Sequence, residues 1–371
     1  MLKPTMLSIT IALLASMPVF AADAPGVTAT EIRIGGVFPF SGPASAFGVI
    51  GKSLKAYVQS INDRGGINGR KINYIAQDDA YSPPKAVEHV RKLVESDEIA
   101  FMFSQLGTPG NTATAKYLAS RGIPSVAIVS GSRRFTDVEQ FPLITTGLVS
   151  FGHEATIYAK YLAKTLPGAK YAILYQNDDL GKDYVRAFKE FLGDEADKRL
   201  VLASYEVTDP TVDSQVVGLK NSGAEALLIA GTPKFAVQTI RKIFEIGWKP
   251  VLIVNYPSSS VGATLRPAGL DKSVGVITGS TNKDPKDPVW KDDAGLNVYR
   301  AFFSQYVAGS DFDDNNYLVG FQQGLILEQI LKQCGDDLSR ENISGRRRTS
   351  GISCFRQPCR ELRSIPATRT T

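Results

Sequence analysis

Apolar positions follow two different periodicities along residues 31–256. Short apolar runs rich in Val, Ile, Phe and Tyr are typical of buried strands, and the stretches between them carry apolar residues at helical spacing. The predicted strands are 31–40, 70–79, 98–104, 123–130, 170–178, 201–207, 224–231 and 249–256. The predicted helices are 47–66, 82–97, 110–122, 154–168, 181–194, 215–223 and 234–247. The alternation runs through two sets of units and predicts an α/β fold of two doubly wound lobes, each a parallel sheet covered by helices.

Parallel α/β sheets bind ligands beyond the carboxyl ends of their strands, next to helix N-termini. The polar turns at these positions are 41–48, 77–84, 104–111, 129–136, 176–183 and 230–235. The turn 104–111, SQLGTPGN, is rich in glycine and hydroxyl groups and has no charged side chain. Because a helix N-terminus offers free N–H groups and a partial positive charge, a carboxylate is its natural partner. Glycine, serine and proline also suit turns that bind nothing, so this pattern alone leaves both interpretations open.

The first residues have the features of an export signal. Lys3 supplies a short positive region, an apolar stretch follows from Met6 to about Met17, and Val19 and Ala21 supply the small residues of a cleavage site. We therefore expect residues 1–21 to be a cleaved signal peptide and the mature protein to be exported to the periplasm. A membrane anchor is the alternative, but the stretch is short for a bilayer.

The basic charge of the chain comes from one segment. The chain has 42 basic and 37 acidic residues, a net charge of +5. Residues 344–371 hold seven Arg and one Glu, a net charge of +6, so the remainder is close to neutral at about −1. The peptide QPCRELRSIPA within this Arg-rich tail permits codons that spell TLPGIKVNTS in another reading frame, which favours a frameshift near Asn342. A genuine basic tail that binds anionic lipid or a membrane protein is the alternative.

The sequence offers little for catalysis. AFGVIGKS (46–53) ends like a phosphate-binding loop, but Ala46 stands where that motif requires glycine. The adjacent acids Asp78 and Asp79 would point to opposite faces of a strand, so we expect them to enter a turn or act at a hinge rather than act as an acid–base pair. The two histidines lie far from any candidate nucleophile, and the three cysteines lack the spacing of a zinc site. We expect no enzyme activity, metal or cofactor.

Several stretches, in order, resemble one family over about residues 27–343. They are IRIGGVFPFSGPASAFG, INDRGGINGRKINYIAQDDAYSPPKAVEHVRKLV, IPSVAIVSGS, YAILYQNDDLGKDYVRAFKEFL and KPVLIVNYPSSSVGATL. They resemble the type I periplasmic solute-binding proteins of ABC importers, in the branched-chain amino-acid-binding branch. The resemblance implies two lobes joined by three crossovers, with residues 22–147 plus 281–340 in one and 148–280 in the other. It also implies a monomer that delivers a small ligand to a membrane permease; a ligand-sensing receptor domain for a signalling partner is the alternative.

The resemblance also implies a set of ligand-binding positions. They are Phe47, Gly107, Thr108, Ser130, Gly131, Ser132, Leu180, Thr232 and Tyr256. Amino-acid-binding relatives place an acid in the second lobe, but the stretch VNYPSSSVG (254–262) has none. Since a buried ammonium without a partner is costly, an aromatic or aliphatic carboxylate becomes more favourable than an amino acid. Asp178 or Asp179 would make a hydrophobic amino acid possible again if either reached the cleft.

Overall fold

A computed structural model describes residues 24–345. The first sheet is formed by strands from the N-terminal part of the chain. The strands of this sheet have the spatial order β2-β1-β3-β4-β5, and every pair is parallel. They are β1 (Glu31–Phe38), β2 (Lys71–Asp78), β3 (Phe101–Phe103), β4 (Ser125–Ile128) and β5 (Ile144–Thr146). The helices that pack with it are α1 (Gly48–Asp63), α2 (Pro83–Glu95), α3 (Thr108–Ser120), α10 (Ala294–Tyr306), α11 (Asn316–Cys334) and α12 (Arg340–Ile343). We call this unit the first lobe.

A second parallel sheet has the order β7-β6-β8-β9. Its strands are β6 (Tyr171–Gln176), β7 (Leu200–Tyr205), β8 (Ala226–Ala230) and β9 (Val251–Val254). Its helices are α4 (Phe151–Thr165), α5 (Asp179–Leu192), α6 (Ala196–Arg199), α7 (Asp213–Asn221), α8 (Pro233–Glu245) and α9 (Arg266–Ala268). This second lobe has an apolar core on each face of its sheet, as a doubly wound arrangement requires. The predicted α/β fold of two parallel-sheet lobes is confirmed.

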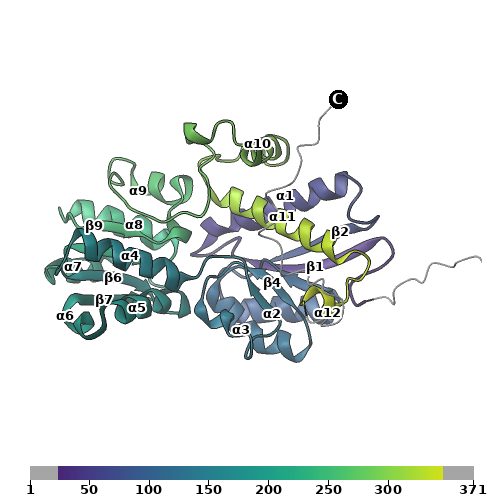
Figure 1. Ribbon diagram of the computed structural model, residues 1–371, viewed down its shortest axis with the longest axis horizontal. Helices are drawn as coiled ribbons and strands as arrows, with labels where there is room; N and C mark the ends of the chain where they lie inside the picture. The colour runs from purple at the N-terminus through teal and green to yellow at the C-terminus, as the bar shows by residue number, and fades with distance from the viewer. Residues whose placement is uncertain (1–23, 346–371) are drawn as a thin grey trace, which may run out of the picture.

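The two lobes lie side by side and the chain passes between them (Figure 1). The first crossing is residues 147–150, between β5 and α4, and the second is residues 278–287, between the end of the second sheet and α10. A third crossing, which the family resemblance implies, is not among the described residues. The predicted signal peptide and most of the Arg-rich tail also lie outside the described residues.

The core of the first lobe depends on close contact between α1 and α11, which cross in front of the first sheet (Figure 1). Gly320 and Gly324 are one turn apart on α11 and face α1. A Cβ on Gly324 would lie 2.3 Å from Cγ of Tyr57, and one on Gly320 would lie 2.4 Å from the carbonyl oxygen of Ile50. The two helix backbones can therefore approach only because these positions lack side chains. At the end of α11, Cys334 is buried and disulfide-bonded.

The predicted strands and helices correspond to observed elements, with ends that shift by a few residues. β5 was missed because it has only three residues and its pairing with β4 is interrupted by a shift in register. A strand this short has no measurable period.

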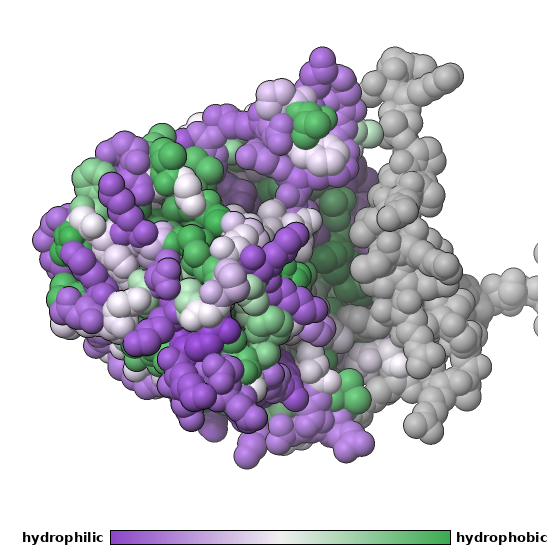
Figure 2. All heavy atoms as spheres, turned by 60° about the vertical axis from the view of Figure 1, so that its left-hand side comes forward, coloured by the Kyte–Doolittle hydropathy of each residue, from purple (hydrophilic) through white to green (hydrophobic). Residues whose placement is uncertain are grey.

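Hydrophilic residues cover much of the face shown in Figure 2, with smaller hydrophobic areas between them. Among the described residues, none of the helices combines the length and apolar character needed to cross a membrane.

The α1–α11 contact gives a test of the packing. Gly324→Ala places a methyl group against the buried Tyr57 ring, and we expect it to lower the free energy of unfolding by about 1–3 kcal/mol. The matched control is Gly218→Ala on α7, where an added Cβ meets nothing within 4 Å. It should raise stability by about 0.5–1 kcal/mol through helix propensity. Urea denaturation of both variants measures the difference, and equal effects would contradict this account of the helix packing.

Candidate functional site

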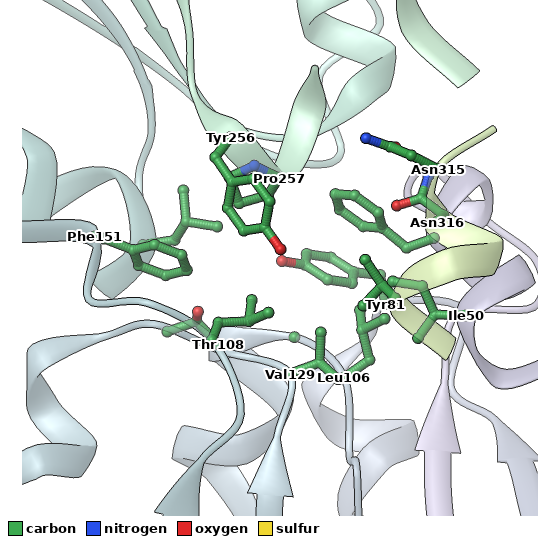
Figure 3. Close-up of a pocket in the computed structure, with 15 residues that line it drawn as sticks. Ile50, Tyr81, Leu106, Thr108, Val129, Phe151, Tyr256, Pro257, Asn315 and Asn316 are labelled. Atoms are coloured by element: carbon green, nitrogen blue, oxygen red, sulfur yellow. The ribbon is translucent and has the colours of Figure 1, made fainter. Parts of the chain in front are cut away.

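A pocket that is partly open to solvent lies between the two lobes. Side chains of both lobes point into it (Figure 3). Apolar and aromatic groups make up most of its wall, and Thr108, Asn315 and Asn316 contribute the polar side chains apart from the tyrosine hydroxyls. None of the lining residues carries a charged side chain. The pocket therefore suits a ligand with an apolar body and a few polar groups.

The first turn of α3 forms the polar end of the first-lobe wall. Gly107 is the N-cap, and its φ of +103° is a conformation that L-residues with side chains rarely adopt. A Cβ there would also lie 2.8 Å from the Tyr81 ring. Within the described residues the backbone N–H groups of Thr108 and Gly110 have no hydrogen-bond acceptor, as expected in a first helical turn. The Thr108 N–H and the positive end of a helix dipole are thus available at the pocket, whereas Gly110 does not line it.

The Thr108 hydroxyl is held beside these N–H groups. Its Oγ1 lies 2.8 Å from Oγ of Ser130, and Ser130 in turn accepts a hydrogen bond from the backbone N–H of Ser132. Because the Ser130 hydroxyl accepts from that N–H, it can donate its own proton to Thr108. The Thr108 proton is then free to donate to a ligand.

Tyr81 reaches the pocket from an unusual turn after β2. Asp78 accepts hydrogen bonds from the backbone N–H groups of Ser41 and Ala80, and Asp79 accepts one of 2.8 Å from the N–H of Tyr81. Ala80 and Tyr81 both have positive φ, at 51° and 61°. The expectation that Asp78 and Asp79 enter a turn is therefore confirmed. Their turn directs the Tyr81 ring into the cleft, where its hydroxyl lies 3.4 Å from the Gln176 amide of the second lobe.

The second-lobe wall is formed by Phe151, Leu180, Tyr256 and Pro257. Glu154, which is buried, accepts hydrogen bonds from the backbone N–H of Tyr256 at 2.6 Å and from the hydroxyls of Tyr158 and Tyr184. Burial raises the pKa of the Glu154 carboxyl, partly offset by these three donors. Glu154 thus holds Tyr256 in place without lining the pocket itself.

The acids that would have favoured an amino acid are engaged elsewhere. Asp178 caps α5 through the N–H groups of Leu180 and Gly181, and its other oxygen accepts from Gln176 at 2.6 Å. Asp179 accepts from Thr112 at 3.3 Å and pairs with Arg134. Neither lines the pocket. The arrangement offers no carboxylate for a ligand ammonium.

The structure divides the predicted ligand-binding residues into two groups. Those that line the pocket are Phe47, Gly107, Thr108, Leu180 and Tyr256. The others do not line it; they are Ser130, Gly131, Ser132 and Thr232.

Each residue of the second group has a different neighbour. Ser130 lies behind Thr108, and the Ser132 hydroxyl donates to Asp183 of the second lobe at 2.8 Å. A Cβ on Gly131 would meet the Val149 carbonyl. Thr232 is fully buried, and its backbone N–H donates to the Tyr205 hydroxyl.

The ten remaining residues of the wall were not predicted as ligand-binding positions from the sequence. These residues are Ile50, Tyr81, Leu106, Val129, Leu148, Phe151, Pro257, Asn315, Asn316 and Val319. The turns 77–84 and 104–111 contain Tyr81 and Leu106, so their place after strands was the usable signal. Asn315 and Asn316 come from the return of the chain after the second crossing, for which no strand–helix pattern was available.

Contacts between the lobes flank the pocket on two sides. On one side Asp183 of α5 accepts from the Ser132 hydroxyl and from the N–H of Arg133, both at 2.8 Å. On the other side the N–H of Gly262 donates to the carbonyl of Asp313 at 2.9 Å, and the Ser260 hydroxyl donates to Asp314 at 2.8 Å. The lobes are therefore in direct contact around the pocket, as in a closed state.

This fold and site match a known family. The model of the family described as periplasmic binding protein matches residues 31–368, and the chain belongs to that family. The match extends into the Arg-rich tail. The family prediction made from the motifs is thereby confirmed.

Individual relatives are distant. Leu/Ile/Val-binding protein homolog 7 of Brucella abortus is 24% identical over 241 residues, which are 60% of this chain and 58% of that protein. The chain thus matches less than two thirds of the length of this curated relative. A fatty acid ABC transporter substrate-binding protein from Thermomonospora curvata superposes with a TM-score of 0.76 at 20% identity, over 87% of this chain and 81% of that one. A solute-binding protein of an ABC transporter from R. palustris, in complex with benzoate, superposes with a TM-score of 0.72 at 21% identity. The match covers 85% of this chain and 84% of that one. These structural likenesses concern the fold.

We predict that stability depends on pH through Asp79, whose carboxyl accepts the hydrogen bond from the backbone N–H of Tyr81. Burial raises the pKa of Asp79 from 3.8 to about 6. A raised pKa in the folded state means that this group's contribution to stability is present below pH 4 and is lost as the pH rises through 6. Asp79→Asn keeps an acceptor oxygen for Tyr81 but cannot titrate. We expect the unfolding free energy of the wild type, relative to this variant, to fall by about 1–3 kcal/mol between pH 4 and 7.

Asp78 serves as a control, because its pKa is shifted in the opposite direction to that of Asp79. Burial favours the neutral form of Asp78, but hydrogen bonds from Ser41 and Ala80 outweigh it and lower its pKa below 3.8. For Asp78→Asn the relative stability of the wild type should instead rise with pH, and only below about pH 4. Denaturant titrations across this range measure both differences. A constant difference for Asp79→Asn would contradict the assignment.

Proposed function

We propose that this protein is a periplasmic receptor of an ABC importer that captures a small carboxylate-bearing solute between its lobes and delivers it to a membrane permease. The proposed ligand is an aromatic or aliphatic acid, with a hydrophobic amino acid less favoured. The observation that carries the proposal is an uncharged, largely apolar pocket with a free N–H group at one end. We further propose that the receptor acts as a monomer and has no enzyme activity.

The first turn of α3 supports a carboxylate as the polar group of the ligand. Thr108, which lines the pocket, offers its backbone N–H group, and its hydroxyl is oriented by Ser130. Hydrogen bonds to a charged acceptor are stronger than those to a neutral one, and a helix N-terminus adds a favourable field. A carboxylate can therefore be held there without a basic side chain.

The remaining wall supports an apolar body without an ammonium group. Phe47, Tyr81, Phe151 and Tyr256 provide aromatic surfaces, and aliphatic side chains fill the space between them. A buried ammonium would need a carboxylate partner, and the wall supplies none. The relatives agree in part: two proteins with this fold are a fatty acid transporter's substrate-binding protein and a benzoate complex, whereas the curated relative is named for leucine, isoleucine and valine.

Import is supported by the family and by the contacts between the lobes. A ligand that touches both walls binds the closed arrangement better than an open one, so it shifts the population towards closure. A closed receptor presents a surface that depends on the ligand, which a permease can recognise.

The Thr108 hydroxyl gives the test. We expect Thr108→Val to weaken the binding of benzoate about ten- to hundredfold in isothermal titration calorimetry, because it removes a hydrogen bond to a charged group. Thr108→Ser keeps the hydroxyl and should bind within a few-fold of the wild type. Benzoate, octanoate and leucine are titrated in parallel.

Two results would contradict the proposal. Tight binding of leucine with no binding of either acid would reverse the assignment of the ligand class. Equal affinities of the Val and Ser variants for benzoate would remove Thr108 from the carboxylate site.

A further inference from the structure

The pocket has a second polar pole at the start of α11, in addition to the one at α3. Asn316 is the first residue of α11, is 4% exposed and lines the pocket. In Figure 3 the oxygen of its side-chain amide points toward the pocket and the nitrogen points away.

Asp314 fixes the orientation of this amide. One carboxylate oxygen of Asp314 accepts hydrogen bonds from the backbone N–H of Asn316 at 3.1 Å and from its side-chain nitrogen at 2.8 Å. Since the same oxygen accepts from a backbone N–H, it is an acceptor, and the group facing it must be the amide nitrogen. The Asn316 Oδ1 is left on the pocket side, and it accepts no hydrogen bond from the described residues.

The two poles therefore differ in chemistry. At α11 the first N–H groups are occupied, because Asn316 donates to the Asp314 carboxylate and Tyr317 donates to the Asp314 carbonyl at 3.1 Å. This pole offers an acceptor rather than donors, unlike the first turn of α3. Among the described residues, Oδ1 of Asn316 is not one of the buried side-chain atoms that lack a partner, so it is open to the pocket and can accept a hydrogen bond from water or from a ligand donor placed there.

From this geometry, and resting on the proposed function, we propose that the ligand is a hydroxy-substituted carboxylic acid whose hydroxyl donates to Oδ1 of Asn316 while its carboxylate binds the first turn of α3. The hydroxyl is the donor that fits, because a neutral O–H needs no counter-charge and the wall has none. Asn316 thus determines the preference for an acid that carries a hydroxyl over one that does not.

The second pole is coupled to closure of the lobes. Asp314 also accepts a hydrogen bond from the hydroxyl of Ser260, which belongs to the second lobe. The amide of Asn316 is therefore fully oriented when the lobes meet. A ligand that binds at this pole makes its hydrogen bond in the closed arrangement, so it binds that arrangement more tightly than an open one. Closure requires such a difference in affinity.

The test compares matched ligands on the wild-type protein by calorimetry. The probes are benzoate, 3- and 4-hydroxybenzoate, and 3- and 4-methylbenzoate, in which a methyl group replaces the hydroxyl at nearly equal size. We expect at least one hydroxybenzoate to bind about tenfold or more tightly than its methyl counterpart. This comparison needs no variant, so it stands even if a substitution impairs folding.

Variants then assign the preference to one residue. Asn316→Leu should reduce the ratio of hydroxybenzoate affinity to methylbenzoate affinity to near one, a readout that a uniform loss of affinity for all benzoates would not change. The matched control, Asn315→Leu, changes the neighbouring pocket residue and should keep the ratio. Loss of the ratio in Asn315→Leu but not in Asn316→Leu would overturn the assignment.

The outcomes separate this inference from the proposed function. If all the benzoates bind with equal affinity, the hydroxy-acid inference is wrong and the carboxylate receptor stands. If none binds and leucine does, both are wrong.

Discussion

The parallel direction of every strand pair constrains the whole site. Parallel strands gather the turns that follow them at one edge of the sheet, and in this protein both such edges face the same cleft. Tyr81 follows β2, Gly107 and Thr108 follow β3, and Tyr256 follows β9. Because these turns lead into helices, free backbone N–H groups arrive at the cleft with the side chains. The fold thereby supplies backbone N–H groups that can bind an anion without a charged side chain.

The charges of the cleft lie at its rim instead of in its wall. Arg134 pairs with Asp179 on one side, and Arg266 pairs with Asp311 and Asp313 on the other. Such exposed ion pairs contribute little to stability, at most about 1 kcal/mol each. Burial of apolar ligand surface contributes roughly 25 cal/mol per Å². The ligand therefore supplies most of the free energy of closure, and the rim pairs align the lobes.

Sequence periodicity was enough for the two parallel sheets apart from β5 and for part of the site, but it did not extend to α10, α11 and α12, which complete the first lobe. It located the turn 104–111, and the resemblance then identified Gly107 and Thr108, because one local pattern of strand, glycine turn and helix contains both. Tyr81 needed more: its place depends on two successive positive φ angles, which the letters DDAY do not reveal. Asn316 is more than 200 residues from Thr108 in the chain, and only tertiary packing brings it to the same pocket. Ser132 was expected at the ligand but donates to Asp183, a partner that exists only once the lobes meet.

The wall of the pocket follows one arrangement four times. In each case a carboxylate behind the wall accepts the backbone N–H of a residue that lines the pocket. The pairs are Asp79 with Tyr81, Asp178 with Leu180, Glu154 with Tyr256, and Asp314 with Asn316. Hydrogen bonds to carboxyl oxygens are directional, so each fixes a lining residue more firmly than packing alone would.

Burial raises the pKa of all four carboxyl groups, which means that their surroundings disfavour charge. A protonated carboxyl still accepts a hydrogen bond through its other oxygen, so the support does not depend on ionisation. Acids placed one layer behind the wall can thus hold it rigid without presenting a negative charge to the ligand. The ligand then meets an N–H group, a hydroxyl, an amide oxygen and aromatic rings, a combination that recognises an acid by its polar ends and its apolar body.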